Sequence, residues 1–449
     1  MQSEVRTDNK DFDLLVIGAG MAGLSAGGRA AEAGARVLIV EKAKEIGGSA
    51  KEALYIWTVP DPRVLRGWDD GDPRLARVIF QHFAEAVEWM HKREVVQYGP
   101  TPVLHGRGYQ IDIPKHQRLC AKAIQSSGGY VTMGAQVQDP ILGSDGRVEG
   151  ARFIVEGELI EVRARWTVLA TGGYQADPEL RSQRIHANAR SIPLRSNPHS
   201  TGDGIRFGFQ AGGTWAGENP GFYGHLVSSP PDISWDKPST FADLAQYHSD
   251  FSLLFNEDGH RFTDESQGDF RSSNMLVFEN NARGLLVWDE HVQREHVMKS
   301  FVYGVEPINK LVLALEHGAH GAKISSLDEI EKVASPWGFD GKTIVRNLLE
   351  YNRAVQECPE KLKPPRAYDL RPMDELPYYV LVVEPAITFT HGGLWVDDHA
   401  RVLNRQGEPI PGLLAAGADA GNIFKLGYAG GIALATTFAL RAVRTAGWL

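Results

Sequence analysis

Three glycines near the start of the chain have the spacing and the neighbours of a phosphate-binding turn. They are Gly18, Gly20 and Gly23, in the pattern G-x-G-x-x-G. A continuous apolar run, Leu14–Ile17, precedes them and is typical of a buried parallel strand. The first glycine allows a sharp bend, the second lets the backbone approach a pyrophosphate, and the third lets the next helix pack closely. Met21 and Ala22 would begin that helix and direct free amides at the anion.

An acidic residue completes the same unit. Val37–Val40 is a second apolar run, and Glu41 follows Gly23 by 18 positions, where a carboxylate can hold ribose hydroxyls. A glycine-rich strand–helix turn without a ligand is the alternative, because the glycine pattern alone is weak. Strand, glycines, helix, second strand and acid agree here, so the sequence predicts a Rossmann-type unit that binds a dinucleotide.

More glycine turns follow along the chain. Gly47 and Gly48 precede Ser49, and this turn either presses against a phosphate or is only a turn. The apolar strand Thr167–Ala170 runs into a glycine pair, and ligands of open α/β sheets lie at the carboxyl ends of such strands. Asp203 lies near the positive end of a further predicted helix.

Size and composition limit the class of protein. The 449 residues exceed one hydrophobic core, so at least two domains are expected. The net charge of -9 argues against nucleic acid or an anionic membrane as the main partner. Only two cysteines are present, Cys120 and Cys358, which excludes a disulfide framework and a cysteine-ligated iron–sulfur cluster. No apolar run has the length of a membrane span and no signal segment is evident, so we expect a cytoplasmic protein.

The glycine-turn pattern is interrupted in the middle of the chain. From about Ser228 prolines and helical patterns replace it, and it returns near Thr388. We therefore expect one domain in two pieces, residues 1–228 and 379–449, with an inserted domain over residues 229–378. Asp72 and Pro73 predict the start of a helix, whereas His105–Tyr109 reads as a loop.

Several stretches together resemble the FAD-dependent fumarate reductase/succinate dehydrogenase flavoprotein superfamily. They are GAGMAGLSA…VEK, TVLATGGY, TGDGI, LLFNEDGHRFTDES, and THGGLWVD…PIPGLLAAG…GYAGG. The resemblance implies an α/β fold: a doubly wound, Rossmann-type FAD-binding domain with an inserted α+β capping domain. It also implies substrate between the two and hydride transfer to or from flavin N5. The motif for covalent flavin attachment is not recognisable, so FAD should be non-covalent.

The glycine turns and the resemblance together give a set of expected FAD contacts. In this family an acid directly after the Ala-Ala-Gly turn holds the ribityl chain; here Ala418 has that place and the acid comes one later. His391, beside a glycine pair, is expected against the flavin ring rather than a metal, since no second ligand has a useful spacing. The expected contacts are Gly18, Gly20, Met21, Ala22, Gly23, Glu41, Lys42, Gly48, Ser49, Ala50, Val137, Ala170, Thr171, Gly172, Asp203, His391, Gly392, Gly417, Ala418, Asp419, Gly431 and Ile432.

The substrate side departs from the fumarate reductases. Those enzymes carry Arg-Leu-Gly-Gly at the start of the last helix, and its arginine holds a carboxylate; this chain has Tyr428-Ala429-Gly430-Gly431. Their His-His-Thr-Met-Gly-Gly run is represented here by TFTHGG, without both substrate-side histidines. Binding a dicarboxylate needs bidentate guanidinium donors. A dicarboxylate substrate is therefore not expected.

With tyrosine at position 428, the chain instead resembles 3-ketosteroid 1-dehydrogenases and related cyclic-ketone desaturases. There a tyrosine hydroxyl and a following backbone amide, here that of Ile432, stabilise the oxyanion that forms when a proton α to a ketone is removed. At the position of the base those enzymes have tyrosine and this chain has Asp269, which is a base or a surface charge. Arg271 is the rival, as a proton donor in a reductase.

The sequence therefore predicts an FAD-dependent oxidoreductase acting on CH–CH groups. The first expectation is a dehydrogenase that forms a C=C bond α,β to a ketone in a cyclic or apolar substrate. The alternatives are an enoate or enone reductase that runs the reverse reaction, a flavin-dependent hydroxylase, which is disfavoured, and a non-catalytic electron-transfer flavoprotein subunit. A second nucleotide motif is not evident, so the electron acceptor or donor should be a diffusible partner.

Overall fold

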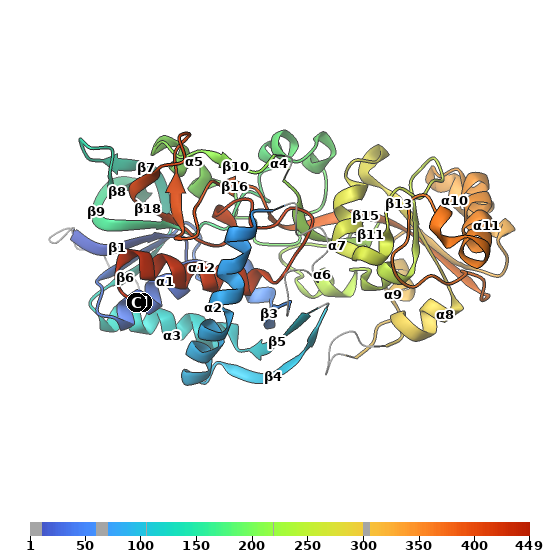
Figure 1. Ribbon diagram of the computed structural model, residues 1–449, viewed down its shortest axis with the longest axis horizontal. Coiled ribbons are helices and arrows are strands. Elements are labelled where there is room, and N and C mark those ends of the chain that lie inside the picture. Colours follow the sequence, from blue (N-terminus) through green and yellow to red (C-terminus); the bar gives the residue numbers. More distant parts are fainter. Residues whose placement is uncertain (1–10, 60–70, 105, 219, 300–305) are drawn as a thin grey trace. The chain divides into compact units, whose positions relative to one another are not determined.

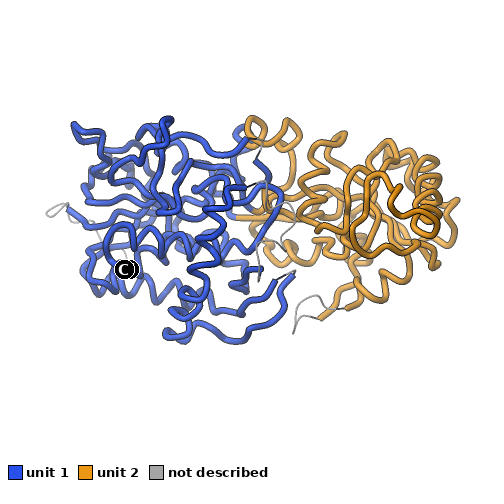
Figure 2. The backbone as a smooth tube through the Cα atoms, in the orientation of Figure 1, with its two compact units in different colours: residues 1–180, 197–221, 389–449 blue, residues 181–196, 222–388 orange. Residues whose placement is uncertain are grey.

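The computed structural model describes residues 11–59, 71–104, 106–218, 220–299 and 306–449. The chain forms two compact units, shown in different colours in Figure 2. Unit 1 comprises residues 1–180, 197–221 and 389–449, and unit 2 comprises residues 181–196 and 222–388. The predicted position His105 lies outside the described residues.

Unit 1 contains an eight-stranded sheet, two small sheets and most of the helices at the two ends of the chain. Its strands are β1 (Asp11–Ile17), β2 (Val37–Glu41), β3 (Tyr55–Thr58), β4 (Val96–Val103), β5 (Gly106–Ile111), β6 (Tyr130–Met133), β7 (Ala135–Leu142), β8 (Val148–Val155), β9 (Glu158–Leu169), β10 (Trp215–Ala216), β16 (Gly393–Leu394), β17 (Arg401–Leu403) and β18 (Pro409–Ala415). Its helices are α1 (Met21–Glu32), α2 (Pro73–Lys92), α3 (Ile113–Ser126), α5 (Asp203–Gln210) and α12 (Gly431–Ala446), and α4 (Pro178–Arg184) crosses into unit 2.

The large sheet has the strand order β17-β18-β9-β1-β2-β6, and β7 and β8 continue from β9. β1 pairs in parallel with β2 and β9, and β2 with β6 and β9 with β18 are also parallel. Helices α1, α3 and α12 pack together in this unit (Figure 1). The carboxyl ends of β1, β9 and β18 therefore lie side by side, where a doubly wound fold binds its ligand.

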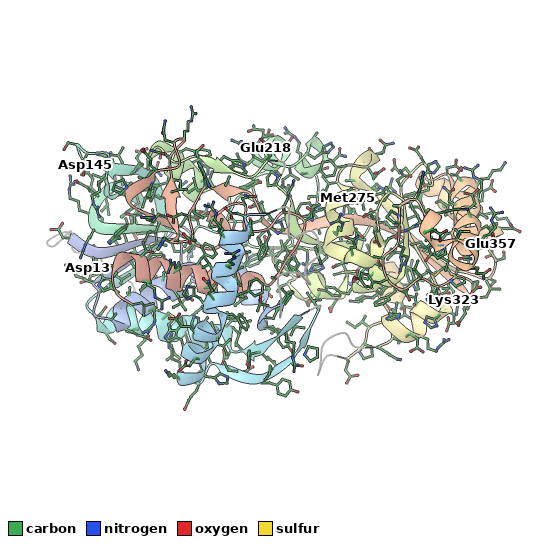
Figure 3. The ribbon with its side chains drawn as sticks, in the orientation of Figure 1. Asp13, Asp145, Glu218, Met275, Lys323 and Glu357 are labelled. Atoms are coloured by element: carbon green, nitrogen blue, oxygen red, sulfur yellow. The ribbon has the colours of Figure 1, made fainter. Side chains whose placement is uncertain are left out.

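Local sequence explains these elements. The strand residues Leu14–Ile17 are buried, as a parallel strand requires. A Cβ at Gly28 of α1 would lie 2.7 Å from the Cβ of Cys120, so glycine is what lets α1 and α3 approach. The predicted helix start at Pro73 is confirmed, because the Asp72 side chain accepts the Arg74 amide at 2.9 Å. Asp145, labelled in Figure 3, accepts the Arg147 amide at 3.1 Å in the hairpin turn between β7 and β8.

The predicted loop at 105–109 is wrong for its described residues. Gly106–Ile111 is strand β5, the central strand of the sheet β3-β5-β4. A Cβ at Gly108 would lie 2.3 Å from the carbonyl oxygen of Ile56 in β3. These glycines permit a close approach of strands and do not form a turn.

Unit 2 is an α+β unit around a five-stranded sheet. Its strands are β11 (Phe222–Ser228), β12 (Leu253–Phe255), β13 (Gly284–Asp289), β14 (Gly321–Ile324) and β15 (Tyr378–Thr390), in the order β11-β15-β13-β12 with β14 also on β15. Its helices are α6 (Ser239–Asp243), α7 (Asp269–Leu276), α8 (Glu290–Val292), α9 (Lys310–Glu316), α10 (Asp328–Ala334) and α11 (Gly341–Glu357). The core includes Trp288, Leu226 and Tyr351.

The compact units are divided at other residues than the expected domains. Strand β11 belongs to the sheet of unit 2 and begins at Phe222. Unit 2 therefore resumes before the expected boundary at 228/229. β15 continues to Thr390, beyond the expected boundary at 378/379. The α/β fold class with an inserted α+β unit is confirmed, whereas the exact domain limits stay a prediction.

Candidate active site

The glycine turn after β1 forms an open cradle. Gly18 has φ +107°, and a Cβ there would lie 2.3 Å from the carbonyl oxygen of Ala170, so only glycine fits. A Cβ at Gly23 would lie 1.9 Å from the carbonyl oxygen of Gly18. By contrast, apart from the two neighbouring residues in the chain, no atom of the described residues lies within 4 Å of a Cβ built on Gly20. Gly20 therefore leaves space where the amides of Met21 and Ala22 begin α1, as a bound pyrophosphate requires.

Glu41 is held at the rim of this turn by two backbone amides. Its carboxylate accepts the Ala19 amide at 2.7 Å and the Ala43 amide at 2.8 Å. A carboxylate offers about four lone-pair sites, so it still has acceptors for ribose hydroxyls. The geometry fits the predicted role of Glu41.

Two predicted contacts, Lys42 and Asp203, are brought together by the fold. The Nζ of Lys42 donates to the Asp203 carboxylate at 2.5 Å and to the Thr201 hydroxyl at 2.6 Å, and Arg206 donates to the other Asp203 oxygen at 2.6 Å. Burial alone would raise the pKa of Asp203, but the hydrogen bonds from Lys42 and Arg206 lower it. Lys42 and Asp203 thus form an ion pair, which the sequence did not indicate.

Asp419 has a structural role that the sequence did not predict. Its fully buried carboxylate accepts the Thr171 amide at 2.5 Å, the Thr171 hydroxyl at 2.9 Å and the Gly173 amide at 3.1 Å. Burial raises the pKa of Asp419 to about 6 against these hydrogen bonds. The side chain therefore joins the ends of β9 and β18. The expected contact of this turn with a ribityl chain stays a prediction; Ala418 is the partly exposed residue of the turn.

The other predicted contacts lie on turns and strand ends of unit 1. Gly48 lies beside Gly20, since a Cβ on Gly48 would be 3.2 Å from the Gly20 Cα. A Cβ on Gly417 would be 3.1 Å from the Ala22 Cβ, which places the turn after β18 against the start of α1. The rest are placed as follows: Ser49 and Ala50 in a 3₁₀ turn, Val137 in β7, Ala170, Thr171 and Gly172 directly after β9, and Gly392 against Trp215 and Pro220.

His391 is buried and has one ring nitrogen without a partner. Its Nδ1 lies 2.7 Å from the carbonyl oxygen of Lys425, while Nε2 has no hydrogen-bond partner among the described residues. Burial lowers the pKa of His391 to about 4, so the ring is neutral near pH 7. Because Nδ1 must donate to that carbonyl, Nε2 of the neutral ring is an acceptor. An orphaned buried acceptor beside a glycine pair fits a group that donates one hydrogen bond, such as the N–H of a flavin ring.

Tyr428 lies in an aromatic cluster at the start of α12. Its ring packs 5.3 Å from that of Trp57 and 5.9 Å from those of Phe389 and Phe424. Its hydroxyl oxygen accepts the Gly431 amide at 2.8 Å. The sequence prediction did not include Trp57, Phe389 or Phe424. Of these, only Phe389 lies within a motif that the prediction used, TFTHGG.

In unit 2, Asp269 is the first residue of α7 and is only 6% exposed. Its carboxylate forms a hydrogen bond with Nδ1 of His225, and Nε2 of His225 lies 2.8 Å from the Tyr223 hydroxyl. Sequence reasoning missed Tyr223 and His225; their i, i+2 spacing on a strand was the signal available, because it puts both on one face. Arg271, also on α7, is partly exposed.

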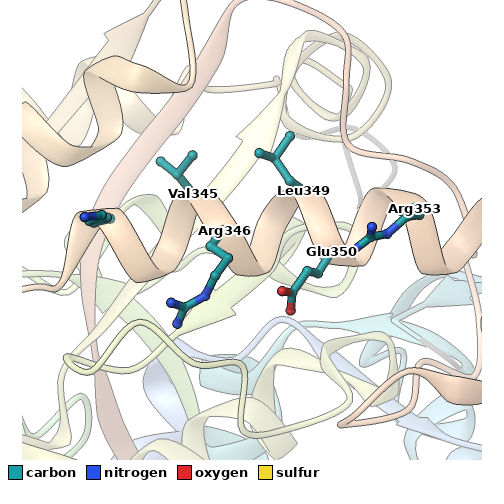
Figure 4. Close-up of a pocket in the computed structure, with 6 residues that line it drawn as sticks. Val345, Arg346, Leu349, Glu350 and Arg353 are labelled. Atoms are coloured by element: carbon teal, nitrogen blue, oxygen red, sulfur yellow. The ribbon is translucent and has the colours of Figure 1, made fainter.

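A separate hollow on α11 does not belong to this chemistry. It measures about 450 Å³ and is lined by Lys342, Val345, Arg346, Leu349, Glu350 and Arg353, all from one helix face (Figure 4). In the described part of the chain, no group of three His, Cys, Asp or Glu residues could hold a metal ion. Among the described residues no helix combines the length and the apolar content that crossing a membrane requires.

A doubly wound sheet with a glycine cradle at the start of α1 is the architecture of a dinucleotide-binding protein. The chain belongs to the FAD binding domain family, whose model matches residues 113–433, and a model for FAD dependent oxidoreductases matches residues 13–174. The protein is therefore an FAD-dependent oxidoreductase, and FAD is its cofactor. The open Gly20 cradle, the free acceptors of Glu41 and the orphaned nitrogen of His391 fit this cofactor.

Relatives confirm the predicted resemblance. The fumarate reductase (cytochrome) of Shewanella frigidimarina is 24% identical over 94% of this chain and 74% of its own length. The 4-oxocyclohexanecarboxylate 2-dehydrogenase of Sinomonas cyclohexanicum is 23% identical over 96% of this chain and 91% of its own. The 3-ketosteroid Δ1-dehydrogenase of Sterolibacterium denitrificans superposes with a TM-score of 0.74 and 17% identity over 98% of this chain and 99% of its own, which is a likeness of fold.

Proposed function

We propose that the protein is a dehydrogenase that forms a C=C bond α,β to a ketone in a cyclic or otherwise apolar substrate. FAD, when bound, supplies the acceptor for the hydride that leaves the β carbon. The observation that carries the proposal is the hydrogen bond between the Gly431 amide and the Tyr428 hydroxyl inside an aromatic cluster. The dehydrogenase from Sinomonas cyclohexanicum, whose name specifies a cyclic ketone, supports this substrate class.

The chemistry of Tyr428 suits a ketone oxygen. Removal of the proton α to a carbonyl puts negative charge on oxygen, and donors already in place lower that barrier. A tyrosine hydroxyl that accepts one amide still has a proton of its own to donate. The amide of Ile432, in the first turn of α12, is the second donor that we propose, because helix carbonyls cannot satisfy the first amides of a helix.

The same surroundings disfavour a dicarboxylate. Tyr428 has the place of the arginine that fumarate reductases use to hold a carboxylate, and its neighbours Trp57, Phe389 and Phe424 are apolar. A carboxylate without a guanidinium partner would be desolvated at considerable cost. An apolar ring can bury its surface against the same aromatic side chains.

The second candidate is an enone or enoate reductase that runs the reverse reaction. It is favoured by the relative from Shewanella frigidimarina, whose name specifies a reductase. In this direction Tyr428 would polarise the carbonyl of an unsaturated substrate, and Arg271 would be a candidate proton donor. In either direction the electrons would pass to or from a diffusible partner.

An anaerobic visible spectrum of the purified flavoprotein tests the direction. The protein is mixed separately with cyclohexanone, 4-oxocyclohexanecarboxylate, a saturated 3-ketosteroid and succinate. Bleaching by a ketone and not by succinate supports the dehydrogenase. If no ketone bleaches the flavin, but an enone or enoate reoxidises the dithionite-reduced protein, the protein is a reductase and the dehydrogenase proposal fails.

The variant Tyr428→Phe tests the mechanism. It removes one hydroxyl and keeps the ring that packs against Trp57 and Phe424. We expect kcat to fall roughly a hundredfold or more, because the loss of one oxyanion donor has that effect. Phe424→Leu is the matched control: it alters the apolar wall without removing a donor and should act mainly on KM. Turnover of Tyr428→Phe within threefold of the parent would contradict the oxyanion role.

A further inference from the structure

Unit 2 contains a chain of three hydrogen-bonded side chains that the sequence prediction did not assemble. The Tyr223 hydroxyl lies 2.8 Å from Nε2 of His225, and Nδ1 of His225 forms a hydrogen bond with the Asp269 carboxylate. His225 is 2% exposed and Asp269 is 6% exposed, whereas Tyr223 is partly exposed. The chain thus runs from a buried carboxylate outward to a phenol.

The backbone holds this arrangement in place. Tyr223 and His225 are two residues apart on β11, so their side chains share a face. Asn274 of α7 joins the two elements: its amide donates to the Phe222 carbonyl at 2.7 Å and its oxygen accepts the Phe222 amide at 2.9 Å. Asp269, on the same helix, is therefore fixed against β11 at the level of His225.

The hydrogen-bond chemistry gives the chain a direction. A carboxylate can only accept, so the bond with Asp269 places the imidazole proton on Nδ1. Nε2 then carries the lone pair and accepts the Tyr223 hydroxyl proton. Burial lowers the pKa of His225 while the Asp269 charge opposes the shift, so the ring is neutral near pH 7 and can take up a proton.

Other groups face the same imidazole. The ring of Tyr247 lies edge-on to it at 4.9 Å, and the positive charges of Arg195 and Lys310 lower its pKa further. These cations disfavour an imidazolium that lacks a counter-charge. Asp269 is the group that compensates them, because it bonds directly to the ring.

We propose that Tyr223 is the proton-transferring group of the reaction and that His225 and Asp269 position it and adjust its basicity. The inference rests on the proposed function. In the dehydrogenase direction the α C–H bond of the ketone breaks and its proton forms the new O–H bond of Tyr223. The Tyr223 proton passes to Nε2 of His225, and the electron pair of the broken bond remains on the substrate as an enolate. Asp269 neutralises the imidazolium that results, as in other relays of this kind.

This assignment changes the role of Asp269. The sequence left Asp269 open as a base or a surface charge, in the place where ketosteroid dehydrogenases have tyrosine. In the structure its buried carboxylate forms a hydrogen bond with Nδ1 of His225, a residue of β11. A phenol then performs the proton transfer, and the aspartate acts through the histidine.

Kinetics of four variants test the proposal on holoenzyme whose FAD content is matched by absorbance. With the ketone that bleaches the parent fastest, Tyr223→Phe should lower kcat by about a hundredfold or more at an unchanged KM within about threefold. His225→Gln and Asp269→Asn should show similar losses. Tyr368→Phe, which removes a half-exposed phenol elsewhere in unit 2, should remain within about threefold of the parent.

The pH profile separates proton transfer from a structural role. In the parent, kcat/KM should fall as His225 becomes protonated, so the acidic limb lies below the usual histidine value of about 6.5. Asp269→Asn removes the charge that raises the pKa of His225, so the limb should move to lower pH. Tyr368→Phe should leave the limb unchanged. The relay would be overturned by a Tyr223→Phe variant with parental kcat. It would also be overturned if the acidic limb of Asp269→Asn lay at the same pH as that of the parent.

NMR of protein with ¹⁵N-labelled histidine provides a readout that does not depend on turnover. At pH 7, Nδ1 of His225 should be protonated and Nε2 unprotonated, and Tyr223→Phe should shift the Nε2 resonance. A protonated Nε2 in the parent overturns the relay even if the ketone is oxidised. If the parent oxidises no ketone and reduces no enone or enoate, the proposed function fails, and the assignment of Tyr223 fails with it.

Discussion

The Asp419 carboxylate accepts both the backbone amide and the hydroxyl of Thr171, at 2.5 and 2.9 Å, although the two residues are 248 positions apart. Asp419 follows β18 and Thr171 follows β9, and these strands are parallel neighbours. A buried carboxylate thus joins the two strand ends that flank the candidate cofactor site. Its hydrogen bonds with Thr171 stabilise the fold.

Asp419→Ala should destabilise the protein strongly. It leaves the amides of Thr171 and Gly173 buried without their acceptor, at about 1–3 kcal/mol for each. We expect the free energy of unfolding to fall by roughly 2–5 kcal/mol, measured by urea unfolding with circular dichroism. Asp398→Ala, on an exposed residue of the same terminal segment, should stay within about 0.5 kcal/mol of the parent. Equal midpoints for the two variants would contradict this account.

Two glycines of the nucleotide turn should respond differently to alanine. At Gly20 a Cβ has open space, so Gly20→Ala should fold but bind FAD at least tenfold more weakly, because the methyl occupies the cradle. At Gly23 a Cβ would lie 1.9 Å from a backbone oxygen, so Gly23→Ala should lower the thermal midpoint as well. Flavin absorbance per protein and the thermal midpoint of the apoprotein check both. Full FAD occupancy in Gly20→Ala would exclude the cradle.

A buried histidine in unit 2 should make stability depend on pH. Burial lowers the pKa of His248 to about 3, and neither ring nitrogen has a hydrogen-bond partner among the described residues. Unfolded chains protonate histidine below about 6.5, so the folded state loses stability as pH falls from that value toward 3.

Substitution of His248 by phenylalanine isolates this effect. Compared with the parent, His248→Phe should gain about 1.4 kcal/mol of unfolding free energy for each pH unit below about 6.5. Urea unfolding at pH 5, 6 and 7.5 gives the comparison. The difference between variant and parent at a single pH also contains packing changes against Trp288, so the slope is the test. A difference that is constant from pH 5 to 7.5 would show that His248 is not a buried neutral group.

Asn274→Ala should loosen α7 from β11. Asn274 is 2% exposed and makes three hydrogen bonds, two with the backbone of Phe222 and one with the Phe270 carbonyl. Loss of these bonds leaves buried backbone groups unpaired, and we expect about 2–4 kcal/mol of destabilisation. Asn280→Ala, at an exposed position, is the control. If His225 is positioned through α7, the ¹⁵N resonances of its ring should change in Asn274→Ala and not in the control.

Local signals in the sequence predicted much of unit 1. The apolar strand Leu14–Ile17, the glycine turn and Glu41 lie within one continuous segment, so their geometry follows from backbone preferences and strand burial. The helix beginning at Pro73 was likewise defined by its capping residue. The error at β5 arose because Gly108 permits strands to approach and does not mark a turn, and only the neighbouring strand distinguishes these cases.

The sequence by itself determined the cofactor and the class of fold, because both follow from short motifs whose residues are close together in the chain and whose order is that of the family. The role of Tyr428 stays a prediction. Only the tertiary structure decided which polar groups meet: Lys42 with Asp203, Asp419 with Thr171, and His225 with Asp269. The physical reason is that such pairs form across elements whose packing is set by the whole core. Residue type states what a side chain can donate or accept, and the fold alone supplies its partner.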